Sequence, residues 1–130
     1  MIILTLRTDK PVSEIGLYEG SSRLNYKSWE AHRRLAETIH LEISAMLKNS
    51  ERSLKDVGGI VIFAGPGSFT GLRIGFSTAN ALVYSLNIPI TTTRGEDWIQ
   101  VGIETLLKGR GGKTAMPEYG SAAHITLPKK

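Results

Sequence analysis

A glycine-rich loop between an apolar stretch and a helical pattern constrains the fold of this chain more than any other feature. Residues 59–64, Gly-Ile-Val-Ile-Phe-Ala, form a short apolar run rich in β-branched side chains, which is typical of a strand buried on both faces in a parallel sheet. Residues 69–86 repeat apolar side chains at helical spacing. A strand, a tight turn and a helix in this order predict an α/β fold.

The loop between them can be interpreted in two ways. Gly65 and Gly67 allow backbone angles that other residues avoid, Pro66 stiffens the turn, and Ser68 or Thr70 can cap the helix. Free amides at a helix N-terminus can also bind an anion. A phosphate-binding P-loop closes with Gly-Lys-Ser/Thr, however, and this loop contains no lysine. The sequence therefore favours a tight joint over a nucleotide-binding loop.

Residues 69–86 predict a helix with two contrasting faces. One apolar face should lie on the sheet, and it comprises Leu72, Phe76, Ala79, Val83 and Leu86. A second face is mostly small, and it comprises Gly71, Gly75, Thr78, Leu82 and Ser85. Each glycine inside a helix costs about 1 kcal/mol relative to alanine, so a close backbone neighbour is the expected reason. The residues alone leave open whether that neighbour is a helix of the same chain or a second protein.

Residues 65–75, Gly-Pro-Gly-Ser-Phe-Thr-Gly-Leu-Arg-Ile-Gly, resemble the signature of the TsaB (YeaZ) family. These proteins are partners in the bacterial synthesis of threonylcarbamoyladenosine in tRNA. Residues 4–8 resemble the opening strand of the family, Ala31-His32 opens a helix where the family has one, and residues 87–93 resemble the strand that follows. The similarity covers about the first 107 residues.

The resemblance implies a single ribonuclease-H-like lobe of the actin and sugar-kinase superfamily, an α/β fold with a mixed five-stranded sheet and helices. We expect residues 1–107 to form this domain and residues 108–130 to be a linker and C-terminal tail. Family members usually carry a second lobe, and the chain resembles a short form that lacks most of it. Residues 116–119 resemble a segment near the carboxyl end of longer relatives, and residues 124–126 could add a short strand.

The remaining pattern predicts the other elements. Residues 2–7, 14–18 and 23–29 resemble an antiparallel meander, and residues 30–48 an amphipathic helix with an Arg33–Glu37 pair outside. Residues 88–93 form a strand whose early Pro89 suits a sheet edge. A last helix is expected to end near residue 107.

Composition narrows the classes of protein. The chain has 130 residues, a formal net charge of +4 and no cysteine, which excludes disulfides and cysteine-ligated metals. No apolar run has the length of a membrane span or the pattern of a secretory signal, so we expect a cytoplasmic protein. A basic balance is compatible with work near tRNA, but the sequence favours an ordinary solvated surface for these charges.

We find no constellation of residues that predicts catalysis. Nucleotide-hydrolysing members of the superfamily place an acid at the end of the first strand, where this chain has Arg7, and we expect Asp9 to begin a turn instead. His32 and His40 are eight residues apart, too far for a zinc-binding pair at i and i+4. The sequence therefore predicts a catalytically silent chain without a metal or cofactor.

The resemblance then favours a second protein as the neighbour of the small face. In the TsaB family two helices pack on a matching pair of TsaD, the subunit that transfers threonylcarbamoyl to tRNA adenosine. Carried over, this implies a TsaD-type partner, tRNA reached only through the complex, and a TsaE-type ATPase as a further candidate partner. The implied partner-binding residues are His32, Gly65, Pro66, Gly67, Ser68, Phe69, Thr70, Gly71, Leu72, Arg73, Ile74, Gly75 and Thr78.

Two other hypotheses stay open from the sequence. One is an enzyme of the same superfamily, either ATP-dependent or glycoprotease-like, which requires the isolated chain to bind nucleotide or metal. The other is a homodimer that uses the same helical face when the partner is absent.

Overall fold

The computed structural model describes residues 1–118, apart from the side chain of His32. Within this part the chain forms one five-stranded sheet with strand order β3-β2-β1-β4-β5. The strands are β1 (Ile2–Arg7), β2 (Val12–Glu19), β3 (Ser22–Glu30), β4 (Val57–Phe63) and β5 (Ile90–Thr93). The helices are α1 (Leu35–Asn49), α2 (Phe69–Leu86) and α3 (Trp98–Leu107), with short 3-10 turns at His32–Arg34 and Leu54–Asp56.

The sheet is mixed, as the sequence predicted. β1, β2 and β3 form an antiparallel meander. β4 lies parallel to β1 on the other side of that strand, and β5 lies parallel to β4. β4 is buried along nearly its whole length, which explains its continuous apolar sequence.

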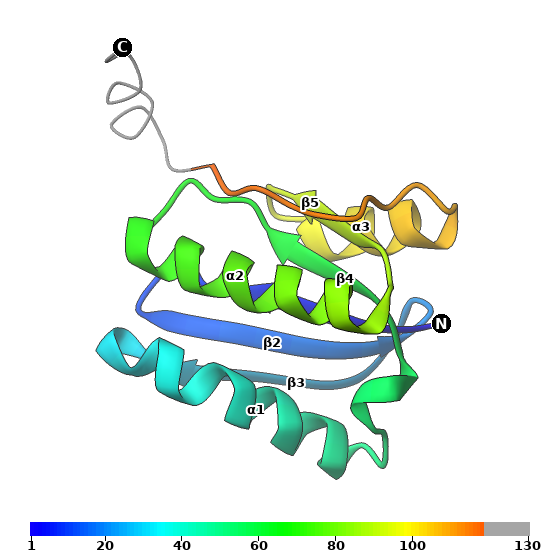
Figure 1. Ribbon diagram of the computed structural model, residues 1–130, viewed down its shortest axis with the longest axis horizontal. Helices are drawn as coiled ribbons and strands as arrows, with labels where there is room; N and C mark the ends of the chain where they lie inside the picture. Colours follow the sequence, from blue (N-terminus) through cyan, green and yellow to red (C-terminus); the bar gives the residue numbers. More distant parts are fainter. Residues whose placement is uncertain (119–130) are drawn as a thin grey trace.

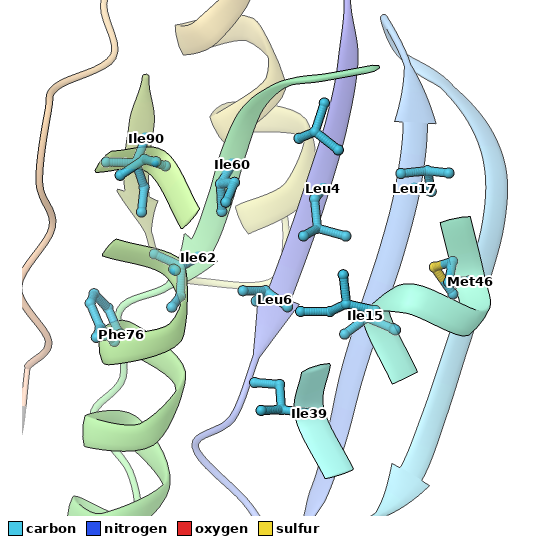
Figure 2. Close-up of a cluster of buried hydrophobic side chains, with 14 of the residues drawn as sticks. Leu4, Leu6, Ile15, Leu17, Ile39, Met46, Ile60, Ile62, Phe76 and Ile90 are labelled. Carbon is cyan, nitrogen blue, oxygen red and sulfur yellow. The ribbon is translucent and has the colours of Figure 1, made fainter. Parts of the chain in front are cut away.

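Helices cover both faces of the sheet. α1 and α2 lie side by side over one face, and α3 covers the other (Figure 1). Figure 2 shows the larger core, in which strand side chains meet those of α1 and α2; the labelled residues include Leu4, Leu6, Ile15, Ile39, Ile62 and Phe76. The smaller core joins the α3 side chains Trp98, Ile103 and Leu106 to Ile3, Val61 and Phe63. The fold therefore leaves the outward faces of α1 and α2 together on one side of the molecule.

The prediction of a helix over residues 30–48 is wrong at its beginning. β3 continues to Glu30, which pairs with Val12 of β2, so this residue is held in the sheet. A 3-10 turn over His32–Arg34 follows, and α1 begins only at Leu35. The expected Arg33–Glu37 pair is also wrong, because Glu37 accepts from the Arg34 guanidinium at 3.0 Å.

Residues 111–118 follow α3 and pack against the edge of the sheet at β5. Gly112 exchanges two backbone hydrogen bonds with Ile90, and the Glu118 N–H donates to the carbonyl of Ala64 at 2.8 Å. The Asn80 side chain on α2 donates to the Ala115 carbonyl at 2.9 Å and accepts from the Ala115 N–H at 2.8 Å. The proposed strand at residues 124–126 lies outside the described residues.

We expect Asn80→Ala to lower the free energy of unfolding by about 1–3 kcal/mol, because it removes both side-chain partners of the Ala115 backbone. Urea denaturation measures this loss, and amide hydrogen exchange should show weaker protection around Ala115. Ser77→Ala, on the exposed side of the same helix, is the control and should change stability by less than about 0.5 kcal/mol. Equal effects of the two substitutions would contradict a fastening role for Asn80.

Candidate functional site

The glycine loop turns the chain from β4 into α2 much as the sequence predicted. Gly65 has a φ of +101°, a left-handed conformation that favours glycine, and its bond to Pro66 is cis. The Ser68 hydroxyl caps α2 by accepting from the Gly71 N–H at 3.3 Å. Of the two predicted caps, Ser68 is therefore confirmed and Thr70 is not.

The reason for Gly67 differs from the expected one. Its φ is not positive, but a Cβ at this position would overlap the side chain of Asp9. The Ser68 N–H next to it donates to the Asp9 carbonyl at 2.8 Å. Gly67 is required because the turn after β1 lies directly against the loop.

The same turn explains the two glycines inside α2. A Cβ at Gly71 would overlap the carbonyl oxygen of Thr8, and a Cβ at Gly75 would overlap the Thr8 hydroxyl. Thr8 is fully buried. The close neighbour of these glycines is therefore the turn after β1 of the same chain, and neither a helix of this chain nor a second protein is needed to explain them.

This packing divides the sequence-predicted site residues. Gly65, Leu72 and Gly75 are buried inside the chain, so a partner protein cannot contact them directly. Pro66, Gly67, Ser68 and Phe69 are exposed in the loop and first turn. The side chain of His32 lies outside the described residues.

Four of the other predicted residues, Thr70, Arg73, Ile74 and Thr78, line a groove between α1 and α2, whereas Gly71 faces the Thr8 carbonyl. This α1–α2 groove has a volume of about 480 Å³ and is lined by Ala36, Thr70, Arg73, Ile74, Ser77 and Thr78. The guanidinium of Arg73 lies 5.5 Å from the ring centroid of Phe69, and the Thr78 hydroxyl donates to the Ile74 carbonyl at 2.9 Å. Sequence reasoning missed Ala36 and Ser77. Ser77 could have been found, because it follows Arg73 by one helical turn.

A second recess adjoins this groove at Thr70 and Ile74. It has a volume of about 640 Å³ and lies between the turn after β1, the chain before α1 and the start of α2. Its charged lining residues are Lys10, Arg33 and Arg34, and we call it the basic pocket. The sequence alone favours an ordinary solvated surface for Arg33 and Arg34 and does not reveal that they share a recess with Lys10.

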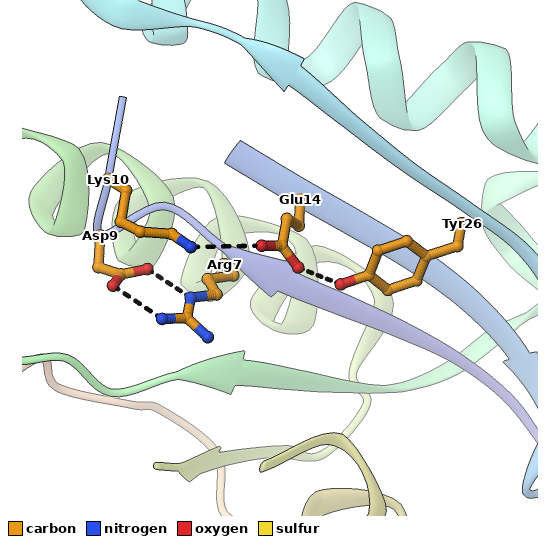
Figure 3. A network of polar contacts seen from close by, with 5 residues as sticks. All are labelled: Arg7, Asp9, Lys10, Glu14 and Tyr26. Carbon is orange, nitrogen blue, oxygen red and sulfur yellow. Dashed lines mark hydrogen bonds and ion pairs between the residues drawn. The ribbon is translucent and has the colours of Figure 1, made fainter. Parts of the chain in front are cut away.

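An ion pair occupies the end of β1, where enzymes of the superfamily have an acid. The Arg7 guanidinium donates to the Asp9 carboxylate, with Nε at 2.8 Å from Oδ1 (Figure 3), and lies 3.9 Å from the centroid of the Phe63 ring. Asp9 is 7% exposed. Its carboxylate is thus engaged within the chain, and residues 1–118 contain no group of three or more side chains able to hold a metal ion.

Figure 3 also shows Glu14 between two partners from neighbouring segments. Its carboxylate accepts from the Tyr26 hydroxyl on β3 and lies 3.6 Å from the Lys10 ammonium. Burial raises the pKa of Tyr26 above its ordinary value of 10.0, and the hydrogen bond and negative charge of Glu14 raise it further. At a pH just above 10, the Tyr26 phenol therefore keeps its proton in the folded chain but loses it in the unfolded chain.

We expect Gly75→Ala to lower the free energy of unfolding by about 1–3 kcal/mol, because its Cβ would push Thr8 away from α2. Thermal unfolding followed by circular dichroism measures the loss. Gly112→Ala is the matched control, since its Cβ would meet no atom closer than 3.7 Å. Combining Gly75→Ala with Thr8→Ala should recover part of the loss, and strictly additive effects would contradict the contact.

We expect Tyr26 to make the free energy of unfolding decrease as the pH rises above 10. Its pKa is raised in the folded state, so above pH 10 the unfolded chain releases a proton that the folded chain retains, and stability falls as pH rises. Urea denaturation between pH 9 and pH 11 should show a smaller loss of stability for Tyr26→Phe than for the wild type. Identical pH profiles for the two proteins would contradict the pairing of Tyr26 with Glu14.

A known protein family matches the segment of the chain that contains the candidate site. A family model described as TsaD, tRNA N6-adenosine threonylcarbamoyltransferase, matches residues 29–93, which is 65 of the 130 residues. This range contains α1, β4, the glycine loop and α2. Both walls of the α1–α2 groove therefore lie within the matched segment.

Curated relatives are similar to part of this chain. The tRNA N6-adenosine threonylcarbamoyltransferase of Geotalea daltonii is 40% identical over 60 residues, which cover 46% of this chain and 18% of the relative. The tRNA threonylcarbamoyladenosine biosynthesis protein TsaB of Bacillus subtilis is 41% identical over 49 residues, which cover 38% of this chain and 21% of the relative. The chain thus matches about a fifth of the length of these proteins.

A solved structure shares the fold. YeaZ from Pseudomonas aeruginosa aligns with a TM-score of 0.67 and 22% identity, and the alignment covers 72% of this chain and 43% of YeaZ. The fold is accordingly ribonuclease-H-like, in agreement with the sequence prediction.

Proposed function

Because this chain belongs to the family of TsaD and TsaB (YeaZ) proteins, we propose that it is a non-catalytic subunit in tRNA threonylcarbamoyladenosine modification. In this proposal it docks on a TsaD-type catalytic subunit through the outward faces of α1 and α2. It acts by binding the competent state of that subunit more tightly than its other states, which raises the population of the competent state.

The α1–α2 groove is the observation that carries the proposal. Its walls are mostly small or uncharged, with Ala36 and Thr78 on facing helices and Arg73 as its one charged lining residue. Small side chains allow helices of a partner to approach closely, because interaxial distances depend on the residues at the contact. Leu41 of α1 is 60% exposed, which adds apolar area on the solvent side of this helix.

The engaged acid at the end of β1 supports a non-catalytic role. Asp9 is the acidic residue nearest to the position used by enzymes of the superfamily, and the Arg7 guanidinium neutralises its carboxylate. A metal-bound phosphate would have to displace that guanidinium. The competing hypothesis is an enzyme of the same superfamily, and the transferase names of the TsaD relatives support it. It predicts that the isolated chain binds nucleotide or metal.

The proposal also covers the route to tRNA, the location and further partners, which only the family resemblance suggests. tRNA would be reached only through the complex, in the cytoplasm, with a TsaE-type ATPase as a further candidate partner and a homodimer through the same face when the partner is absent. The division into a domain over residues 1–107 and a linker and tail over residues 108–130 stays a prediction. No helix within residues 1–118 is long and apolar enough to cross a membrane.

Size-exclusion chromatography with light scattering tests the docking. We expect a stable complex of this chain with the TsaD-type subunit of its own source, and we expect Ser77→Arg to weaken it at least about tenfold, since a long charged side chain would fill the groove. Ser22→Arg, exposed at the start of β3, is the matched control and should bind like the wild type.

Each outcome of that experiment separates the hypotheses. Equal binding by both variants would place the interface elsewhere on the chain. Absence of any complex with the wild type would contradict the proposed partner, and a dimer of the isolated chain that Ser77→Arg abolishes would favour the homodimer. Hydrolysis of ATP by the isolated chain, lost in Asp9→Asn, would favour the enzyme.

A further inference from the structure

We propose that the basic pocket binds the phosphoryl group of a small molecule. The pocket lies beside the α1–α2 groove, but it is a separate recess with its own charges, and the inference does not depend on the docking proposal. It combines three features of the chain: basic side chains, a helix N-terminus and a buried hydroxyl without a partner.

The charges that line the pocket are all positive. Lys10 comes from the turn after β1, and Arg33 and Arg34 come from the 3-10 turn before α1. Lys10 lies 3.6 Å from Glu14, and Arg34 pairs with Glu37 at 3.0 Å, but Lys10, Arg34 and Glu37 are all well exposed. Such pairs contribute little free energy, so Lys10 and Arg34 can turn toward a bound anion. Arg33 makes no ion pair within the described residues.

The N-terminus of α2 adds a further positive contribution. Ser68, Thr70 and Gly71 in its first turn line the pocket, and α2 is 18 residues long with no acidic residue in that turn. The dipole of a helix of this length favours an anion at its N-terminus. No acidic side chain of α2 neutralises this end of the helix.

The buried hydroxyl of Ser13 is the independent observation that points to a ligand. Ser13 is 0% exposed and lines the pocket, and its Oγ has no hydrogen-bond partner within the described residues. Ser13 lies two residues before Ile15, whose side chain belongs to the core beneath α1 and α2. Side chains two residues apart on a strand point to the same face, so the Ser13 side chain also points to the face of the sheet that α1 and α2 cover. Buried hydroxyls are normally paired, and a phosphate oxygen in the pocket would accept the Ser13 hydrogen.

The shape of the pocket favours a small molecule over RNA. A volume of about 640 Å³ is that of a typical small-ligand site. Pro11, Ala31, Leu35 and Ile74 form apolar walls that suit the carbon body of a ligand. No aromatic side chain lines the pocket, whereas proteins that bind single-stranded RNA usually stack bases on aromatic rings.

Isothermal titration calorimetry of the whole chain in phosphate-free buffer tests the inference, with inorganic phosphate, ribose 5-phosphate and adenosine 5′-monophosphate as probes. We expect saturable binding of all three, weaker at high salt because the rim is solvent-exposed. Tighter binding of the two larger probes would show that the apolar walls hold the body of the ligand. Equal affinity for all three would limit the site to the phosphoryl group.

Two pairs of variants make the test specific. Arg33→Gln and Ser13→Ala should each weaken phosphate binding about tenfold, the equivalent of about 1.4 kcal/mol for one charged hydrogen bond. Lys55→Gln removes an exposed charge outside the pocket, and Thr5→Val removes another buried hydroxyl without a partner. Both controls should bind like the wild type.

Absence of saturable phosphate binding would overturn the inference, as would equal losses in the variants and their controls. Because Arg33 is exposed, its substitution tests the site even where Ser13→Ala fails to fold. Binding of tRNA that inorganic phosphate does not displace, with no binding of the small probes, would assign the pocket to RNA instead. None of these results depends on a TsaD-type partner, so failure here and failure of the docking proposal are distinguishable.

Discussion

The packing of Thr8 against α2 is the constraint on which both surfaces of this protein depend. Because Gly71 and Gly75 have no side chains, α2 can lie directly on the turn after β1. This contact brings Lys10 beside the start of α2 and holds the helix next to α1, so that the groove and the basic pocket share Thr70 and Ile74. A bulkier residue at either glycine would move α2 and change both surfaces together.

Local pattern predicted the elements well and their contacts poorly. α2 occupies residues 69–86 as its periodicity indicated, because the loop, the cap and the apolar face all act within one segment. The start of α1 was misplaced because Glu30 is held by Val12, a residue far away in the sequence. The approach of Thr8 to α2 is likewise a long-range contact, and no periodicity reveals it.

The same distinction applies to the site. The resemblance pointed to one segment as the partner-binding site, but it could not separate Arg73, which faces solvent, from Leu72 and Gly75, which face the interior. Orientation around a helix predicted the burial of Leu72, and the position of Gly75 depended on a neighbour unknown from sequence. Ala36 joined the groove only because α1 lies beside α2, which is a property of the fold.

Residues 111–118 have a consequence for how this protein behaves at high concentration. An unpaired edge strand can recruit strands of other molecules and begin aggregation, and Gly112 already occupies the backbone of Ile90 at the β5 edge. Within residues 1–118, the other edge of the sheet is β3. That strand carries the charged side chains of Arg23, Lys27 and Glu30, which oppose the stacking of identical strands. The two edges of one sheet thus differ, because one is covered at Ile90 by backbone pairing and the other carries charged side chains.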